Sequence, residues 1–350
     1  MRFNQLGSSG LSVSEVCLGS MTWGIQNTQA DADAQIQLSL DAGINFIDTA
    51  EMYPVPPNEQ TQGDTERIIG NWLSRYPERR KDLVIMTKIA GPGFAYLRDA
   101  SMISAHSIEI ALAQSLQRLN TDYIDVYQLH WPNRTSPHFG KHWPNQVKAS
   151  QTDVASEKER MRGIVVALGD AIKAGKIRHW GLSDDTPWGI ATYLSLCAEM
   201  GVPRPVSIQN EFSLLHSKDW PYLIEHCVFE DIAYLPWSPL AGGALSGKYL
   251  NAERPAGSRW TMVQRQGLFR DTAQSREAIQ AYVNLANELG MTPSQMALAW
   301  CRQVDGVTST IIGATTEAQL QENIAAFSLT LTDTDLLAIQ AVLARYPSPF

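Results

Sequence analysis

The stretch from residue 83 to residue 130 decides the fold, because two strand-like runs flank one helix-like run. The first run reads Leu83–Val–Ile–Met–Thr87, and the second reads Ile124–Asp–Val–Tyr–Gln–Leu129. Short, largely apolar runs of this kind suit parallel strands that helices cover on both faces. Between the two runs, apolar residues recur at the helical spacing: Ile108, Leu112, Leu116 and Leu119. The stretch therefore predicts a strand, a helix and a second, parallel strand.

The same alternation extends over the rest of the chain. Further strand candidates are Val16 to Leu18, Asn45 to Asp48, Ile177 to Leu182, Val206 to Gln209, Ile232 to Trp237 and Ser309 to Ile312. Further helical stripes are Met161, Ile164, Val165, Leu168 and Ile172, and then Ile279, Val283 and Ala286. Eight such units in one chain predict an α/β fold, a (β/α)8 TIM barrel that forms a single domain over residues 1–350. Two short β-like pieces, Phe3 to Leu6 and Ser12 to Glu15, predict an N-terminal hairpin outside the repeat.

Three loops are long enough to build a site. They are Pro54 to Gly63 after the second strand, Pro132 to Glu157 after the fourth, and Ser238 to Gln274 after the seventh. Each follows the C-terminal end of a strand, where barrel enzymes place their active sites. The segment Pro132 to Glu157 is either a lid or a disordered loop, and the sequence leaves both open.

Composition and charge exclude several classes of protein. The formal net charge is −8, and such a surface repels the phosphate backbone of nucleic acids. No stretch reaches the roughly 18 apolar residues of a membrane helix. The four cysteines form no C-x-x-C pair, so neither a zinc cluster nor a redox pair is expected. We therefore expect a soluble, cytoplasmic protein that binds neither nucleic acid nor membrane, with an unknown oligomeric state.

Four polar residues stand where strands two to four end. Asp48, Lys88 and His130 each follow a strand-like run directly, and Tyr53 lies five residues beyond Asp48. Adjacent strands lie about 4.8 Å apart, so these side chains can converge. A phenol can protonate the oxyanion that hydride transfer to a carbonyl creates, and a nearby ammonium lowers its pKa from about 10. A carboxylate would keep the lysine charged, and a histidine would polarise the carbonyl. Each residue alone has an ordinary structural explanation; the set of four favours carbonyl chemistry.

Seven ordered motifs resemble those of the aldo-keto reductase family. They are Phe46–Ile–Asp–Thr–Ala–Glu–Met–Tyr53, Ile85–Met–Thr–Lys88, Asp125–Val–Tyr–Gln–Leu–His–Trp–Pro132, Gly181–Leu–Ser, Ile208–Gln–Asn, Trp237–Ser–Pro–Leu–Ala–Gly–Gly and Ile312–Gly–Ala–Thr. The resemblance runs from Arg2 to about Ala326. The branch looks like the one that contains the potassium-channel β-subunits, and the segment from Glu51 to Pro57 most resembles the bacterial Tas-like proteins.

The resemblance implies NADPH as the cofactor and a small aldehyde or ketone as the substrate. It assigns proton transfer to Tyr53, tuning of that tyrosine to Lys88 and Asp48, and orientation of the carbonyl to His130. It implies that Ser183, Asp184 and Gln209 hold the nicotinamide carboxamide and that Trp237 stacks on the ring. For the pyrophosphate and the adenosine end it implies Ser238, Pro239, Leu240, Gly242, Lys248, Arg259, Gly313, Thr315, Gln319, Glu322 and Asn323.

Two residues depart from the family pattern. The family usually has asparagine where this chain has Asp184, and tyrosine where this chain has Trp237. An ionised aspartate accepts hydrogen bonds but cannot donate one to the carboxamide oxygen. An indole can still stack on a ring. The effect of both changes on cofactor geometry is open.

Other readings of the chain remain. The lack of a G-x-G-x-x-G after a strand argues against a Rossmann dehydrogenase. A metal-dependent barrel enzyme would need paired histidines at strand ends, and only His138 and His142 are close in sequence, in a loop expected to be solvated. A regulatory or redox-sensing subunit that binds NADPH with little turnover stays open. Trp23, Met52 and Trp131 are expected to line an apolar substrate pocket, although barrel-top packing explains each of them equally well.

Overall fold

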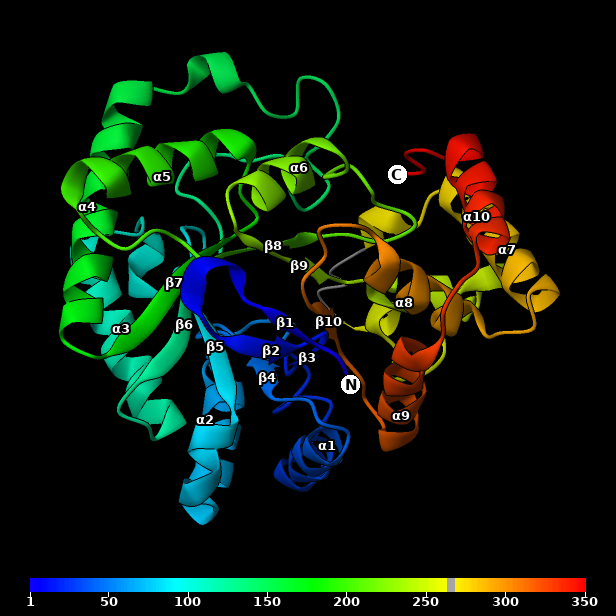
Figure 1. Ribbon diagram of the computed structural model, residues 1–350, viewed down its shortest axis with the longest axis horizontal. Coiled ribbons are helices and arrows are strands. Elements are labelled where there is room, and N and C mark those ends of the chain that lie inside the picture. The colour runs from blue at the N-terminus through cyan, green and yellow to red at the C-terminus, as the bar shows by residue number, and fades with distance from the viewer. Residues whose placement is uncertain (263–267) are drawn as a thin grey trace.

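The chain forms a barrel of parallel strands surrounded by helices (Figure 1), and the computed structural model describes residues 1–262 and 268–350. Within this part the sheet order is β10-β3-β4-β5-β6-β7-β8-β9. The strands are β3 (Val16–Gly19), β4 (Phe46–Asp48), β5 (Val84–Ile89), β6 (Ile124–Leu129), β7 (Ile177–Ser183), β8 (Ser207–Glu211), β9 (Ala233–Trp237) and β10 (Thr310–Ile312). The edge strands approach each other, since the Thr308 amide donates to the Tyr234 carbonyl at 2.9 Å. The predicted (β/α)8 barrel is confirmed.

Helices follow the strands and cover the outside of the barrel (Figure 1). They are α1 (Gln29–Asp41), α2 (Asp64–Arg75), α3 (Ala105–Leu119), α4 (Val154–Lys173), α5 (Pro187–Met200), α6 (Tyr222–Phe229), α7 (Ala273–Glu288), α8 (Pro293–Gln303), α9 (Glu317–Ala325) and α10 (Asp333–Arg345). The three predicted stripes fall on α3, α4 and α7. Ser104 begins α3 with a capping box, in which its hydroxyl accepts from a backbone amide that has no partner inside the helix.

An N-terminal hairpin closes one end of the barrel, as predicted. Strands β1 (Phe3–Gln5) and β2 (Ser12–Ser14) pair antiparallel. Leu6 and Val13 are fully buried in one cluster with side chains from the barrel strands. Gly7 has a φ of +51° and approaches so closely that a Cβ there would lie 2.4 Å from the Val206 carbonyl. Only glycine fits at position 7, because the hairpin packs there against the chain just before β8.

The side chains inside the barrel change from apolar to polar along the strands. Successive side chains of a strand point to opposite faces, so residues two apart share one face. Phe46, Met86 and Val126 belong to the apolar interior cluster beside the hairpin. Two positions further along their strands stand Asp48, Lys88 and Gln128, and two beyond Gln128 stands His130. The polar residues therefore gather at the C-terminal end of the barrel.

The predicted long loops follow β4, β6 and β9. Helix α4 begins at Val154 after the N-cap Asp153, so the end of the loop predicted to reach Glu157 is already helical. After β9 the described chain runs through short 3-10 turns to α7. Residues 263–267 of the loop predicted from Ser238 to Gln274 lie outside the described part. Among the described helices none alone has the length and apolar character to cross a membrane, and one bent pair, Glu317–Ser328 with Asp333–Arg345, meets that test of length and composition jointly.

Candidate active site

A buried ion pair lies at the centre of the polar end of the barrel. Lys88 Nζ lies 2.6 Å from Asp48 Oδ1, and both side chains are almost fully buried. The ammonium also donates to the Thr49 carbonyl at 2.7 Å. Gln209 Nε2 donates to Asp48 Oδ1 at 2.9 Å and to Gln128 Oε1 at 3.0 Å. These contacts hold the lysine side chain in one position.

The rings of Tyr53 and His130 meet beside this ion pair. Their centroids lie 5.7 Å apart with the ring planes at 76°, and Lys88 Nζ lies 4.9 Å from the Tyr53 ring centroid. His130 follows β6, and its amide donates to the Ile89 carbonyl at 2.9 Å. The His130 Nδ1 atom is buried and has no hydrogen-bond partner within the described residues. The structure thus brings together all four residues that the strand ends predicted.

The pKa of Tyr53 differs from the expectation. Burial raises the pKa of Tyr53 well above its ordinary value, Asp48 and Asp184 add to the rise, and Arg259 opposes it. The predicted lowering by Lys88 is not seen, because Asp48 compensates the ammonium charge. Burial, with the charge of Lys88, lowers the pKa of His130 well below its ordinary value. Both rings are therefore neutral near pH 7, and the Tyr53 hydroxyl carries its proton.

A cavity of about 690 Å³ opens above these residues. Tyr53, His130 and Asp48 form part of its lining. Met52 and Trp131 also line it, as expected for the substrate pocket. A volume of this size can hold a drug-sized ligand. The cavity therefore opens directly onto the polar residues at the C-terminal end of the barrel.

Trp23 is placed differently from the expectation. It is fully buried and does not line the cavity. Its indole Nε1 donates to Gln35 Oε1 at 3.0 Å, on α1. The side chain belongs to the main hydrophobic core. Trp23 is therefore a core residue, because the chain after β3 turns its indole toward α1.

The residues that the resemblance assigns to the cofactor fall into two groups. Ser183, Asp184, Gln209, Trp237, Ser238, Gly242, Arg259 and Gly313 line the cavity. Pro239, Leu240, Lys248, Thr315, Gln319, Glu322 and Asn323 are not part of that lining. The second group has local contacts: the Thr315 hydroxyl donates to Gln319 Oε1 at 3.0 Å, and Glu322 Oε1 accepts from Thr292 at 2.7 Å. Asn323 Nδ2 donates to the Gly313 carbonyl at 3.3 Å, which connects this group to the edge of the cavity.

Arg259 places a guanidinium group at the cavity wall, and this group is suited to a phosphate. In the described part of the chain Arg259 forms no ion pair, and its Nη2 contacts Met21 Sδ at 3.1 Å. Burial lowers the pKa of Arg259 to about 10, with the charge of Arg270 as the next cause, so the guanidinium stays charged at neutral pH. Lys248 packs over Gly243, where φ is +90° and a Cβ would lie 2.9 Å from Lys248 Cε. A charged guanidinium that lacks a carboxylate is suited to a ligand anion.

The loop after β6 contributes site residues that the sequence analysis missed. His138 is 9% exposed, and its Nδ1 lies 3.5 Å from Asp184 Oδ1. Phe139 stacks on Trp237 at 5.9 Å between ring centroids and meets Trp131 edge-on at 6.5 Å. The expectation that His138 and His142 lie in a solvated loop is wrong for His138, because the loop folds over the barrel. The aromatic residue next to His138 was the available sign. No group of three metal-ligating side chains occurs in the described residues.

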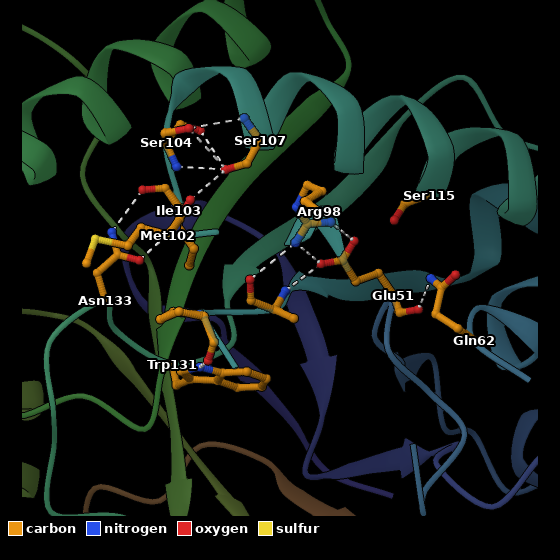
Figure 2. Close-up of polar contacts among 12 residues, drawn as sticks. Glu51, Gln62, Arg98, Met102, Ile103, Ser104, Ser107, Ser115, Trp131 and Asn133 are labelled. Carbon is orange, nitrogen blue, oxygen red and sulfur yellow. Dashed lines mark hydrogen bonds and ion pairs between the residues drawn. The ribbon is translucent and has the colours of Figure 1, made fainter. Parts of the chain in front are cut away.

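A second missed feature is a buried ion pair behind Tyr53, shown in Figure 2. Arg98 Nη1 and Nη2 donate to Glu51 Oε2 and Oε1, each at 2.7 Å, and Glu51 is 0% exposed. The Ala90 amide also donates to Glu51 Oε1 at 2.7 Å. Gln62 Nε2 donates to the Glu51 carbonyl at 2.6 Å (Figure 2). Glu51 therefore connects the loop that carries Tyr53 to the segment after β5.

Comparison with known proteins agrees with this geometry. The model of the Aldo/keto reductase family matches residues 15–344, so the chain belongs to the aldo/keto reductase family and is an oxidoreductase by class. It is 42% identical to Protein tas of Escherichia coli (strain K12), over 100% of both chains. It is 31% identical to the Probable voltage-gated potassium channel subunit beta of Oryza sativa subsp. japonica, over 99% of this chain and 98% of that one. It is 30% identical to the Uncharacterized oxidoreductase YrpG of Bacillus subtilis (strain 168), over 95% and 92%.

Proposed function

We propose that the protein is an NADPH-dependent reductase that converts small aldehydes or ketones to alcohols, with Tyr53 as the proton donor. The observation that carries the proposal is the meeting of the Tyr53 and His130 rings beside the Lys88–Asp48 ion pair, at the floor of the cavity. The four buried cysteines are free, which favours a reducing compartment such as the cytoplasm.

NADPH, when bound, supplies the hydride for carbonyl reduction. Trp237, Ser183, Asp184 and Arg259 would hold it, since all four line the cavity. The carbonyl oxygen of the substrate would lie between the side chains of Tyr53 and His130. His130 donates a hydrogen bond that polarises the carbonyl, and the Tyr53 hydroxyl gives its proton to that oxygen. Lys88, which pairs with Asp48 beside the tyrosine ring, offsets the charge of Asp48 and so limits the cost of the phenolate that this transfer leaves behind.

Aromatic side chains surround the proposed position of the substrate. Trp131, Phe139 and Met52 contribute apolar surface, and Phe139 packs against both Trp131 and Trp237. Apolar burial of this kind favours a hydrophobic carbonyl compound over a charged one. We therefore propose aromatic and other hydrophobic aldehydes as the first substrates to test.

A second candidate function is an NADPH-binding regulatory subunit with little turnover. The likeness to a protein named Probable voltage-gated potassium channel subunit beta favours it. The two candidates differ in one measurable property, because both bind NADPH and only the reductase consumes it with a carbonyl substrate.

The test is NADPH oxidation with a panel of aromatic and aliphatic aldehydes. We expect turnover by the parent protein and a fall in kcat of at least about a hundredfold in Tyr53→Phe, the usual scale for losing a general acid. The affinity of Tyr53→Phe for NADPH should change little. Tyr127→Phe is the matched control, since the Tyr127 hydroxyl is buried without a partner among the described residues and lies in the main core. Near-normal kcat in Tyr53→Phe would contradict the assignment, and NADPH binding without turnover would favour the regulatory subunit.

A further inference from the structure

Asp184 is a buried carboxyl group with few partners. It follows β7 directly and is 2% exposed. Trp237 Nε1 donates to Asp184 Oδ1 at 3.1 Å, and His138 Nδ1 lies 3.5 Å from the same oxygen. Burial lowers the pKa of His138 to about 3, so that imidazole is neutral. No Lys or Arg of the described chain forms an ion pair with Asp184.

Other carboxylates buried at this end of the barrel each have a cation. The pairs are Asp48 with Lys88, Glu51 with Arg98, Asp185 with Arg134 and Glu211 with Arg270. A buried carboxylate without a cation is costly in free energy, and such a group takes up a proton instead. The absence of a cation thus distinguishes Asp184 from its immediate neighbour Asp185.

Two of the three charges that act on Asp184 favour its protonated form, as burial does. Burial raises the pKa of Asp184 well above its ordinary value; the hydrogen bond from Trp237 opposes this, Glu211 and Asp219 add to it, and Lys88 opposes it weakly. Lys88 is already paired with Asp48. The other groups that face Asp184 are His138 and Tyr53, and burial keeps both of them neutral.

Asp219 provides an internal comparison. It is half-buried and also has no ion pair in the described chain, and it accepts hydrogen bonds from Tyr234 and Asn210. Its pKa is nevertheless raised to about 6, with burial as the main cause. Asp184 has one such donor, Trp237, so its charged form receives less support than that of Asp219.

We propose that Asp184 acts as a neutral carboxylic acid and holds the nicotinamide carboxamide in the way that asparagine does elsewhere in the family. The inference rests on the proposed binding of NADPH in this cavity. A protonated carboxyl has a donor O–H beside an acceptor oxygen, much as a side-chain amide has a donor NH2 beside an acceptor oxygen. Trp237 donates to Oδ1, which leaves Oδ2 to carry the proton. The acid can therefore donate to the carboxamide oxygen and accept from its NH2 group.

The first experiment detects the proton directly, without cofactor. Infrared spectra of the parent protein and of Asp184→Asn are compared at pH 7. We expect the parent to show the carbonyl stretching band of a protonated carboxylic acid and Asp184→Asn to lack that band. The matched control is Asp219→Asn, a half-buried acid outside the cavity lining, which should keep the band of Asp184. A parent spectrum without a band that Asp184→Asn removes would overturn the proposal.

The second experiment compares the two oxidation states of the cofactor. The nicotinamide ring of NADP⁺ is cationic and that of NADPH is neutral, so an ionised Asp184 would favour NADP⁺. We expect the ratio of the Kd for NADP⁺ to the Kd for NADPH to differ by less than about fivefold between the parent and Asp184→Asn. In Asp219→Asn this ratio should equal that of the parent. A larger preference of the parent for NADP⁺ would show a carboxylate, because a full charge near the ring is worth more than about fivefold in affinity.

Asp184→Asn should bind NADPH as tightly as the parent or up to about fivefold more tightly, the worth of one hydrogen bond. Clearly weaker binding would show that the acid is not equivalent to an amide and would overturn the inference. Failure of the parent to bind NADPH at all would instead contradict the proposed function, and the infrared result would still stand by itself.

Discussion

Removing Arg98 should destabilise the protein more than removing its partner Glu51. In Arg98→Gln the carboxylate of Glu51, which is 0% exposed, loses two hydrogen bonds of 2.7 Å and keeps one from Ala90. Breaking one side of a buried pair costs about 3–5 kcal/mol. Because Arg98 is 13% exposed, water can replace it in part, and we expect a loss of about 2–4 kcal/mol in the free energy of unfolding.

The charge-neutral partner variant costs less. In Glu51→Gln the remaining guanidinium can turn toward water, and we expect a loss of about 1–2 kcal/mol, the scale of one or two hydrogen bonds. The double variant should recover part of the loss of Arg98→Gln, because it carries no uncompensated charge.

The assay is urea unfolding of the three variants, together with kcat well below the unfolding transition. Arg118→Gln is the matched control, since Arg118 pairs with the fully buried Glu66 at 2.6 Å, between α3 and α2. Both arginine variants should lose stability, but only Arg98→Gln should lower kcat, because Glu51 lies two residues before Tyr53. The reasoning would be refuted if Arg98→Gln were as stable as the parent. It would also be refuted if Glu51→Gln were less stable than Arg98→Gln.

Three further predictions concern the cavity. Lys88→Met should lower kcat by about a hundredfold, because Asp48 then faces the phenolate of Tyr53 without its cation, and the pH profile of the residual activity should shift upward; an unchanged profile with retained activity would contradict the coupling. The parent should prefer NADPH over NADH by at least about tenfold, and Arg259→Ala should remove most of that preference while NADH kinetics stay nearly constant; equal efficiency of the parent with both cofactors would argue against the phosphate site. Phe139→Ala should raise KM for aromatic aldehydes by about three- to tenfold, the worth of one aromatic contact, and leave small aliphatic aldehydes unaffected; an equal rise for both would exclude an aromatic contact with the substrate.

The fold and the catalytic cluster could be predicted because both follow from local periodicity. The strand β6 was predicted at its observed bounds, Ile124 to Leu129. Asp48, Lys88 and His130 were predicted to converge because parallel strands of a barrel end at one face. The regular spacing of strands turned three positions that are far apart in the chain into neighbours.

The loops could not be predicted in this way, because they have no period that reports which side chains are buried. His138 and Phe139 lie in a segment of mixed polarity, and only its path over the barrel brings them to Asp184 and Trp237. Trp23 follows β3 closely, yet the direction of one turn points it toward Gln35 instead of the cavity.

The sequence alone determined which residue types stand at the ends of the strands, and thereby the class of chemistry. Tertiary structure alone decided their charge. Three features depend on how separate segments pack. They are the distance between Lys88 and Asp48, the pairing of Arg98 with Glu51 across 47 positions in sequence, and the lack of a Lys or Arg paired with Asp184 in the described chain. Burial and charge compensation set the cost of each ionised form, and both are properties of the folded chain, so the raised pKa values of Tyr53 and Asp184 appear only in the structure.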